Sequence, residues 1–445
     1  MIAVERALSF LLRPFAKVKP AEVVTVLILT STVFLLLTAY YLLKIAREPL
    51  ILLGGGAEVK SYAAAGQALL LLAFVRVYGS VAKRFGRLRL LASVYLFFAT
   101  NLLVFAALAT ANVPVGVPFY LWVGVFNYTS IAQLWAFAAD VYTAEQGKRL
   151  FAILGIGSSF GAVAGAQAAR LLAAEGPPTL LLTATGLLVA CVLLVAWADK
   201  RSLRERPTES TSAPDPISTQ SAFSLILRDR YLLLLAALTL LLNWVNSNGE
   251  YLLDRSLLDA LDSHDDHHGA VAVVARYKAE YFGWVNVIGV ALQLFVVSRV
   301  LTRLGPRAAL FFLPVVALGG YVLLIGAPIL PLIRVAKIAE NSLDYSVQGT
   351  ARQALYLVAT RAEKFVGKTA VDTFFVRFGD VLSAAWVWLG ARLALSTPAF
   401  AAINVVLIAA WLVVVVALGR EHRRRSAEGD LATDRHPPAA QDTTP

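Results

Sequence analysis

The sequence predicts an all-α membrane protein with about twelve transmembrane helices, arranged as two halves of six. The first supporting observation is composition: of 445 residues, 58% are hydrophobic and only 16% are charged. The second is that apolar runs long enough to cross a bilayer recur along the whole chain. The third is that short sequence markers repeat at one offset. These features exclude a soluble multidomain protein.

The apolar runs divide into twelve predicted spans, of which the tenth and eleventh are the most polar. Their limits are roughly 21–43, 61–82, 88–110, 116–140, 151–173, 178–198, 231–253, 279–301, 307–326, 329–358, 369–393 and 397–418. No small-residue cleavage site separates the basic N-terminal residues from the first span, so we expect no signal peptide. The single cysteine, Cys191, excludes an intrachain disulfide.

The net charge of +11 is concentrated in alternate loops. The basic loops lie near residues 83–89, 148–149, 200–206, 299–307, 361–364 and 420–425, whereas the loop after span seven is acidic. The positive-inside rule then places both termini in the cytoplasm, most simply in a bacterial inner membrane. Topology explains most of the basic excess, and nothing beyond charge points to nucleic-acid binding.

Two markers indicate an internal duplication. Arg84 and Arg303 occupy similar Gly-containing basic loops and are 219 residues apart, while the dipeptides Gly147-Lys148 and Gly367-Lys368 are 220 apart. This spacing predicts a parallel repeat of six plus six spans, the arrangement of major facilitator transporters. The predicted parts are an N-terminal half (1–198), a polar cytoplasmic linker (199–222), a C-terminal half (223–418) and a disordered cytoplasmic tail (419–445).

The tenth span carries a polar stripe. At 100° per residue, seven side chains would lie within roughly a 120° arc of one helix. Facing lipid, the five ionic members would cost on the order of 12–17 kcal/mol, so we expect the stripe to face protein or a water-filled path. Its members are Arg334, Lys337, Glu340, Asn341, Asp344, Gln348 and Arg352.

Charged residues also occur at the predicted ends of spans one, seven and eleven. Lys44, Arg47 and Glu48 close the first span as an interfacial anchor, an outer gate or a phosphate contact. Glu250 and Asp254 close span seven, from which they could pair with Lys44 or Arg47 in a gate. Lys368 and Asp372 begin span eleven, either as an intrahelical pair or as ligands.

Two further motifs have simple interpretations. Gly155, Gly157, Gly161 and Gly165 follow no strand and lack dinucleotide-binding spacing, so they predict close helix packing. The run His264–His268 contains three histidines, but its spacing fits no compact metal motif, and we expect a solvated loop. We therefore expect neither a metal site nor a cofactor, and no nucleophile–base set suggests an enzyme.

Several segments together resemble the plastid and bacterial ATP/ADP translocase type of nucleotide transporter. Leu43-Lys44-Ile45-Ala46-Arg47-Glu48-Pro49-Leu50, followed by Gly56-Ala57-Glu58, is similar to the family's first-span signature. Leu134–Ala138 and Gly147–Phe151 resemble its Trp-containing segment and basic loop. Leu343–Ser346 and Glu363–Asp372 resemble its late Lys-Tyr-Ser and Glu-x-Lys-x-x-Gly-Lys block, which is the most specific match.

The resemblance implies that Arg47 stands where the family's first-span Lys contacts or gates nucleotide, that Glu250 is the span-seven acid, and that Lys368 is the late basic residue. The family's fourth-span acid has no counterpart between Leu121 and Ala139, and Asp254 replaces a family Lys. The implied function is nucleotide exchange of the ATP/ADP type by alternating access.

The expected substrate-binding residues are Lys44, Arg47, Glu250, Arg334, Lys337 and Lys368, and the expected gating or coupling residues are Glu48, Asp254, Asp344 and Asp372. The expected partners are a small anionic substrate, a nucleotide by resemblance, and the lipid bilayer. A proton-coupled major facilitator carrier of another metabolite or drug is the main alternative, in which Glu250, Asp344 or Asp372 would titrate. A non-transporting scaffold or sensor is a third hypothesis.

Overall fold

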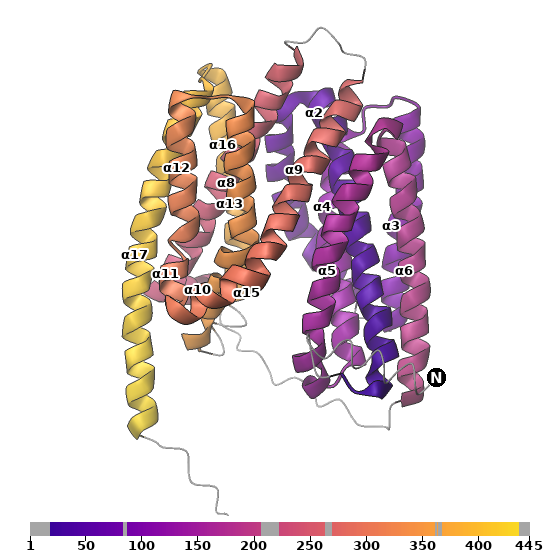
Figure 1. The fold of residues 1–445 in the computed structure, drawn as a ribbon, viewed down its shortest axis with the longest axis horizontal. Helices are drawn as coiled ribbons and strands as arrows, with labels where there is room; N and C mark the ends of the chain where they lie inside the picture. The colour runs from indigo at the N-terminus through magenta and orange to yellow at the C-terminus, as the bar shows by residue number, and fades with distance from the viewer. Residues whose placement is uncertain are drawn as a thin grey trace, which may run out of the picture. The chain divides into compact units, whose positions relative to one another are not determined.

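A computed structural model describes residues 18–82, 87–205, 222–262, 269–360, 363 and 367–435. Throughout these ranges the chain is helical apart from short turns, and it contains no strand (Figure 1). The predicted all-α class is therefore confirmed. The His264–His268 run and most of the predicted linker lie outside the described residues.

The long helices before the linker are α2 to α6. After the short 3-10 turn η1 (Pro20–Glu22), they are α2 (Val23–Ala82), α3 (Arg87–Thr110), α4 (Gly116–Val141), α5 (Ala144–Leu172) and α6 (Pro177–Glu205), with the turn η2 (Ala173–Glu175) between the last two. The later elements are α7 (Ala222–Arg228), α8 (Arg230–Asp262), α9 (Ala270–Leu292), η3 (Gln293–Val297), α10 (Ser298–Arg303), α11 (Gly305–Ala309), α12 (Phe312–Gly326), α13 (Leu330–Leu343), η4 (Asp344–Gln348), α14 (Gly349–Leu355), η5 (Tyr356–Val358), α15 (Lys368–Ala370), η7 (Val371–Phe375), α16 (Val376–Arg392) and α17 (Thr397–Arg435).

Nine of the described helical stretches are long and apolar enough to cross a membrane. One of them, Val23–Leu71, contains the first predicted span and the start of the second, because α2 runs through both. The remaining two predicted spans correspond to α4 and to the α13–α14 segment. Their aromatic, amide and charged residues lower the mean hydropathy. The helices thus agree with about twelve spans.

The first and seventh spans extend further than we predicted. Helix α2 departs from helical geometry at Gly56, whose φ of 80° is a value that glycine adopts readily. Lys44, Arg47 and Glu48 therefore lie inside the helix rather than at its end. Likewise, α8 continues to Asp262, beyond Glu250 and Asp254. The prediction failed because it ended each span at its first charges, whereas these charges are paired inside the protein.

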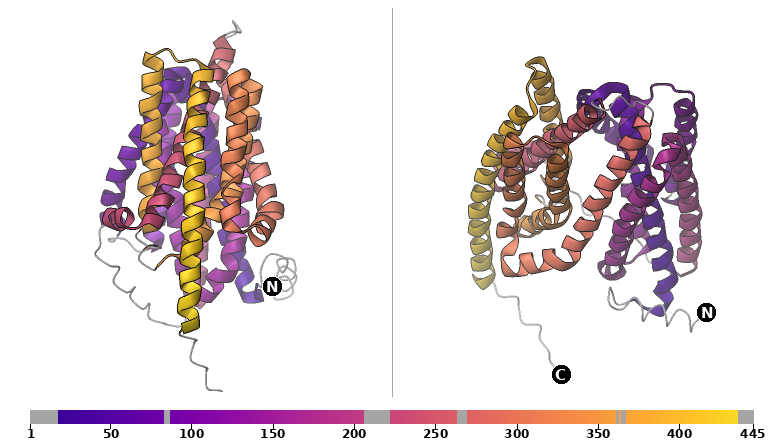
Figure 2. Two further views of the ribbon diagram at one scale, coloured as in Figure 1. Left: turned by 90° about the vertical axis from the view of Figure 1, so that its left-hand side faces the viewer. Right: turned by 45° about the horizontal axis from the view of Figure 1, so that its top comes forward.

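Contacts divide the chain into two compact units. Unit 1 comprises Met1–Ala213 and Asp254–Val287, and unit 2 comprises Pro214–Leu253 and Ile288–Pro445. Helices α8 and α9 therefore each contribute residues to both units. In unit 1, α2 packs against α4, α5 and α6, and α3 packs against α6. In unit 2, α12 packs against α13 and α17 (Figure 2).

Small residues allow α5 to approach α2 closely in unit 1, as the sequence predicted. A Cβ added at Gly157 would lie 2.9 Å from the Thr30 carbonyl oxygen, and one at Gly165 would lie 2.6 Å from the Thr38 carbonyl oxygen. Thr38 also donates a hydrogen bond to the Gly161 carbonyl oxygen at 3.2 Å. The prediction of close helix packing is confirmed at these positions.

Replacing Gly161 with Ala is expected to destabilise the protein by about 1–3 kcal/mol, because the added methyl group overpacks the contact. Its Cβ would lie 3.0 Å from the Phe34 Cα and 3.1 Å from the Leu37 Cβ. Thermal unfolding of the purified protein in detergent measures the effect. Gly155→Ala is the matched control on the same helix, since its Cβ would have no neighbour within 4 Å. Equal melting of the two variants would contradict the packing argument.

The described part of unit 2 includes the π-helical turns η3, η4 and η7. The wider turn η4 interrupts the helix that carries the polar stripe, so the residues after it do not keep the phase of a regular α-helix. All seven stripe residues are nevertheless at least half-buried: Lys337, Glu340, Asn341 and Gln348 are buried, and Arg334, Asp344 and Arg352 are half-buried.

Helix α17 also departs from expectation, because it continues to Arg435 through residues predicted to be disordered. Ion pairs stabilise the first part of this extension. Arg424 donates to Glu421 at 2.6 Å, and Arg425 bonds to Asp229 and, at 3.2 Å, to Glu363. These pairs hold this part of α17 to the segments before α8 and α15.

Candidate functional site

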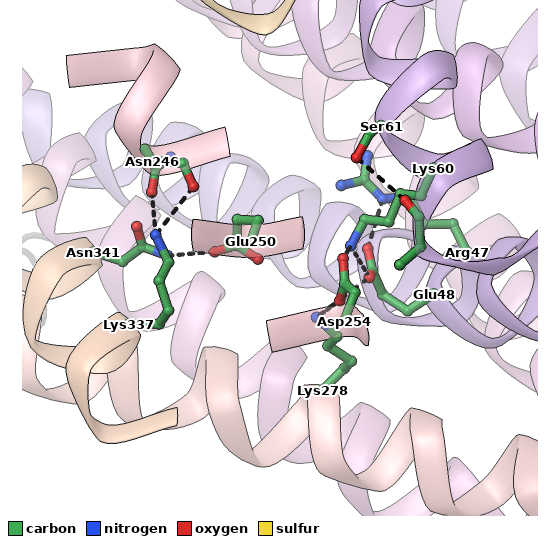
Figure 3. Close-up of polar contacts among 11 residues, drawn as sticks. Arg47, Glu48, Lys60, Ser61, Asn246, Glu250, Asp254, Lys278, Lys337 and Asn341 are labelled. Atoms are coloured by element: carbon green, nitrogen blue, oxygen red, sulfur yellow. Dashed lines mark hydrogen bonds and ion pairs between the residues drawn. The ribbon is translucent and has the colours of Figure 1, made fainter. Parts of the chain in front are cut away.

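Four buried ionic side chains form a closed cluster in unit 1 (Figure 3). The Lys60 ammonium lies 2.5 Å from a Glu48 oxygen and 2.7 Å from an Asp254 oxygen. Lys278 bonds to Asp254 and lies 3.7 Å from Glu48. Each carboxylate thus faces both ammonium groups. We call these four residues the ionic cluster, whose formal charges cancel.

The ionic cluster joins four segments that are distant in sequence. Glu48 lies in α2 before the Gly56 break and Lys60 lies after it, while Asp254 comes from α8 and Lys278 from α9. Lys278 is fully buried, Glu48 is equally inaccessible, and Asp254 is 1% exposed. Because a buried charge is stable only when it is paired and hydrogen-bonded, these side chains depend on one another.

Arg47 adds a positive charge beside the neutral cluster. Its Nε donates to Glu48 at 3.2 Å, and its guanidinium carbon lies 4.4 Å from the centre of the Tyr120 ring. Within the described residues its two terminal nitrogens form no hydrogen bond. The side chain is 13% exposed. One edge of the guanidinium is therefore held in place while the other can donate to a ligand.

Lys44 lies one helical turn before Glu48 among aromatic residues. Its ammonium is 3.9 Å from the centre of the Phe282 ring and 5.3 Å from that of Tyr41. The Tyr41 hydroxyl donates to Asn286 at 2.8 Å, which fixes its ring. Cation–π contacts of this kind stabilise the charged lysine where few water molecules can solvate it.

A second polar cluster lies in unit 2 around Lys337. The ammonium group donates to the Asn246 side-chain oxygen at 2.7 Å and to its carbonyl oxygen at 3.2 Å, and it lies 3.1 Å from Glu340. The Tyr321 hydroxyl donates to Glu340 at 3.2 Å. Gly249 leaves room for the lysine to cross α8, since a Cβ there would lie 2.9 Å from the Lys337 Cδ. Lys337 is 1% exposed.

The remaining predicted site residues also belong to unit 2. Glu250 accepts a hydrogen bond from Asn341 at 2.9 Å (Figure 3). Arg334 lies one turn before Lys337 on α13. Lys368 and Asp372 form a long pair of 4.0 Å at the start of span eleven. Asp344 lies in η4 and interacts electrostatically with Arg352 and Lys337 without a close ion pair among the described residues.

The structure therefore brings together only part of the predicted set. Arg47, Glu48 and Asp254 meet in unit 1, but Asp254 pairs with Lys60 and Lys278 rather than with the expected Lys44 or Arg47. The sequence did contain a signal for the missing lysines: they are 218 residues apart, close to the offset of the other repeat markers. Their acid partners are 206 residues apart and end corresponding spans of the predicted halves.

Comparison with known sequences gives a consistent result. A sequence profile described as "Major Facilitator Superfamily" matches residues 23–342. The chain is 23% identical over 355 residues to an ADP,ATP carrier protein 1 of Chlamydia pneumoniae, covering 69% of this chain and 68% of that protein. The corresponding Chlamydia muridarum protein is 22% identical over 364 residues, covering 70% and 68%.

Solved structures of transporters share the fold at low sequence identity. The nucleoside transporter NupG matches with a TM-score of 0.63 and 11% identity, covering 88% of this chain and 98% of that one. A bacterial homologue of the iron transporter ferroportin, in an inward-facing state, also has a TM-score of 0.63, with 11% identity and coverages of 89% and 98%. These likenesses concern the fold alone.

Proposed function

Because this chain belongs to the Major Facilitator Superfamily and is an integral membrane transporter, we propose that it exchanges nucleotides of the ATP/ADP type. Exchange would proceed by alternating access, most simply across a bacterial inner membrane with both termini in the cytoplasm. The similarity to ADP,ATP carriers of Chlamydia supports this choice of substrate.

The geometry of Arg47 is the observation that carries the proposal. A planar guanidinium binds a phosphate group best when two of its nitrogens donate together. The Nε of Arg47 already donates to Glu48, and one face of the guanidinium packs on the Tyr120 ring. These two contacts fix the guanidinium and leave its terminal nitrogens oriented for such a ligand. The ionic cluster is neutral by itself, and Arg47 therefore leaves a net positive charge that an anionic substrate would neutralise.

The other proposed substrate contacts differ in how far they must rearrange. Lys44 is one turn from Arg47 and makes cation–π contacts that a phosphate could replace. Lys337 must leave Asn246 and Glu340 before it can bind substrate. Lys368 is held by the long pair with Asp372 and by a cation–π contact of 5.8 Å with Tyr356, so it needs the least rearrangement. Arg334 and Glu250 complete the proposed set.

The ionic cluster is suited to act as a gate. Its crossed pairs, Lys60 with Asp254 and Lys278 with Glu48, connect α2 to α8 and α9. A transition that separates these helices must break both pairs in a buried setting. Substrate binding at the adjacent Arg47 would then change the charge balance at Glu48. Exchange follows if the empty carrier reorients slowly, because a ligand shifts an equilibrium only by differential binding.

Uptake of labelled ATP into proteoliposomes containing the purified protein tests the proposal. We expect uptake only when the vesicles contain ADP or ATP, since reorientation requires bound substrate. Empty vesicles and vesicles without protein are the controls. Uptake driven by a pH gradient with no internal nucleotide would support the proton-coupled alternative instead. No nucleotide uptake by protein with a cooperative melting transition would refute the proposed substrate.

A further inference from the structure

Four arginines form a basic patch in unit 2, near its C-terminal end. They are Arg303 at the end of α10, Arg307 in α11, and Arg420 and Arg423 in α17. Within the described residues none of the four makes a hydrogen bond or an ion pair. Their neighbours Arg424 and Arg425 are instead paired with carboxylates.

The patch is continuous across adjacent helices. Helices α11 and α12 pack against α17 in unit 2, and Arg307 lies close enough to His422 to act on it electrostatically. Arg303, Arg420 and Arg423 are exposed, and Arg307 is half-buried. In Figure 1, α11 lies beside α17, and α10 lies next to α11. These four arginines, which make no ion pair among the described residues, therefore present one positively charged surface.

An exposed apolar surface leads into this patch along α17. Val413 is 69% exposed and Val416 is 40% exposed, and Arg420 and Arg423 follow at helical spacing. At 100° per residue the four positions fall within roughly an 80° arc, so one face changes from apolar to basic toward the cytoplasmic end. On the neighbouring helix, Val315 is 55% exposed.

We propose that the basic patch binds the headgroup of an anionic glycerophospholipid in the leaflet on the side of the C-terminal tail. The lipid phosphate would contact the arginines, and its acyl chains would lie along Val413, Val416 and α12. The positive-inside rule accounts for the side on which these arginines lie. That rule does not explain why the four patch arginines make no ion pair among the described residues while the neighbouring Arg424 and Arg425 are paired with carboxylates. It also does not explain the exposed apolar face of α17 that adjoins the patch. A free anion would use the patch but not that face.

The test compares lipids on the purified full-length protein. Dioleoylphosphatidylglycerol is expected to bind and to raise the melting temperature, whereas dioleoylphosphatidylcholine is not; native mass spectrometry counts the bound lipids. Replacing Arg420 and Arg423 together with Gln is expected to weaken phosphatidylglycerol binding roughly 30-fold, at about a factor of five for each basic residue. Arg303→Gln with Arg307→Gln tests the same surface from other helices, should the first variant fold poorly.

The matched control removes the same charge elsewhere. Arg89 and Lys200 are exposed basic residues of unit 1, and changing both to Gln is expected to leave phosphatidylglycerol binding unchanged. Equal binding by wild type, the patch variants and the control would overturn the proposal, because net charge alone would then explain it. Equal stabilisation by inorganic phosphate at matched ionic strength would overturn the lipid assignment in favour of a soluble anion. None of these outcomes depends on nucleotide transport.

Discussion

Replacing Asp254 with Asn is expected to destabilise the protein by about 3–5 kcal/mol, the usual effect of removing one partner from a buried ion pair. Asp254 accepts from both Lys60 and Lys278, and its loss leaves two ammonium groups to share Glu48. Lys278 is fully buried, so its charge depends on these partners rather than on solvent. Thermal unfolding in detergent, together with the yield of membrane-inserted protein, measures the loss.

A second substitution separates lost charge balance from lost shape. Combining Asp254→Asn with Lys278→Met restores neutrality, so the double variant is expected to be more stable than Asp254→Asn alone. Asp259→Asn is the control, because Asp259 lies on the same helix and is exposed. A stable single variant, or a double variant no better than the single one, would mean that the ionic cluster contributes little to the fold.

Periodicity and composition predicted the helices and one packing contact well. Long apolar runs have few alternatives in a membrane, where every backbone group must be bonded within a helix. Glycine at every fourth position of α5 likewise predicted a close approach, and α2 provides the facing backbone at Phe34 and Thr38. Both features depend on local sequence, which explains their success.

The ionic cluster could not be predicted in the same way. The predicted second and eighth spans begin at residues 61 and 279, immediately after Lys60 and Lys278, so the prediction places neither lysine inside a span. Lys60 reaches an acid 194 residues away, a pairing that depends on the tertiary fold. The repeat offset related the two lysines to each other, but it could not show that each would contact both acids.

The angular arc of the polar stripe could not be predicted from the sequence, for a different reason. Its arc assumed a uniform α-helix, and the π-helical turn η4 alters the phase between Asn341 and Arg352. A π-helical turn depends on the packing of neighbouring helices, and the hydropathy pattern does not indicate where one occurs. Gln348 illustrates the outcome, since its amide is buried and lacks a hydrogen-bond partner among the described residues.

Replacing Arg47 with Gln is expected to raise the KM for nucleotide uptake about tenfold to a hundredfold, because a hydrogen bond to a charged group contributes about 1.5–3 kcal/mol. Arg47→Lys is expected to fall between this variant and wild type, since it keeps the charge but loses the paired donors. Initial rates of labelled ATP uptake into ADP-loaded proteoliposomes measure the change. Melting temperatures of the same preparations report whether Glu48 keeps its lysine partners.

The control for this prediction is Arg276→Gln, which removes a cation that is 67% exposed and paired with Glu280 on one helix. The KM of this variant should match that of wild type, because an exposed ion pair contributes little to stability. Arg276 is also distant from Arg47 in sequence and, unlike Arg47, is largely exposed. If Arg47→Gln also kept the wild-type KM, the open edge of its guanidinium would not face substrate, and Lys44 and Lys368 would be the next phosphate ligands to test. If it lost uptake only together with its melting transition, Arg47 would serve the ionic cluster rather than the nucleotide.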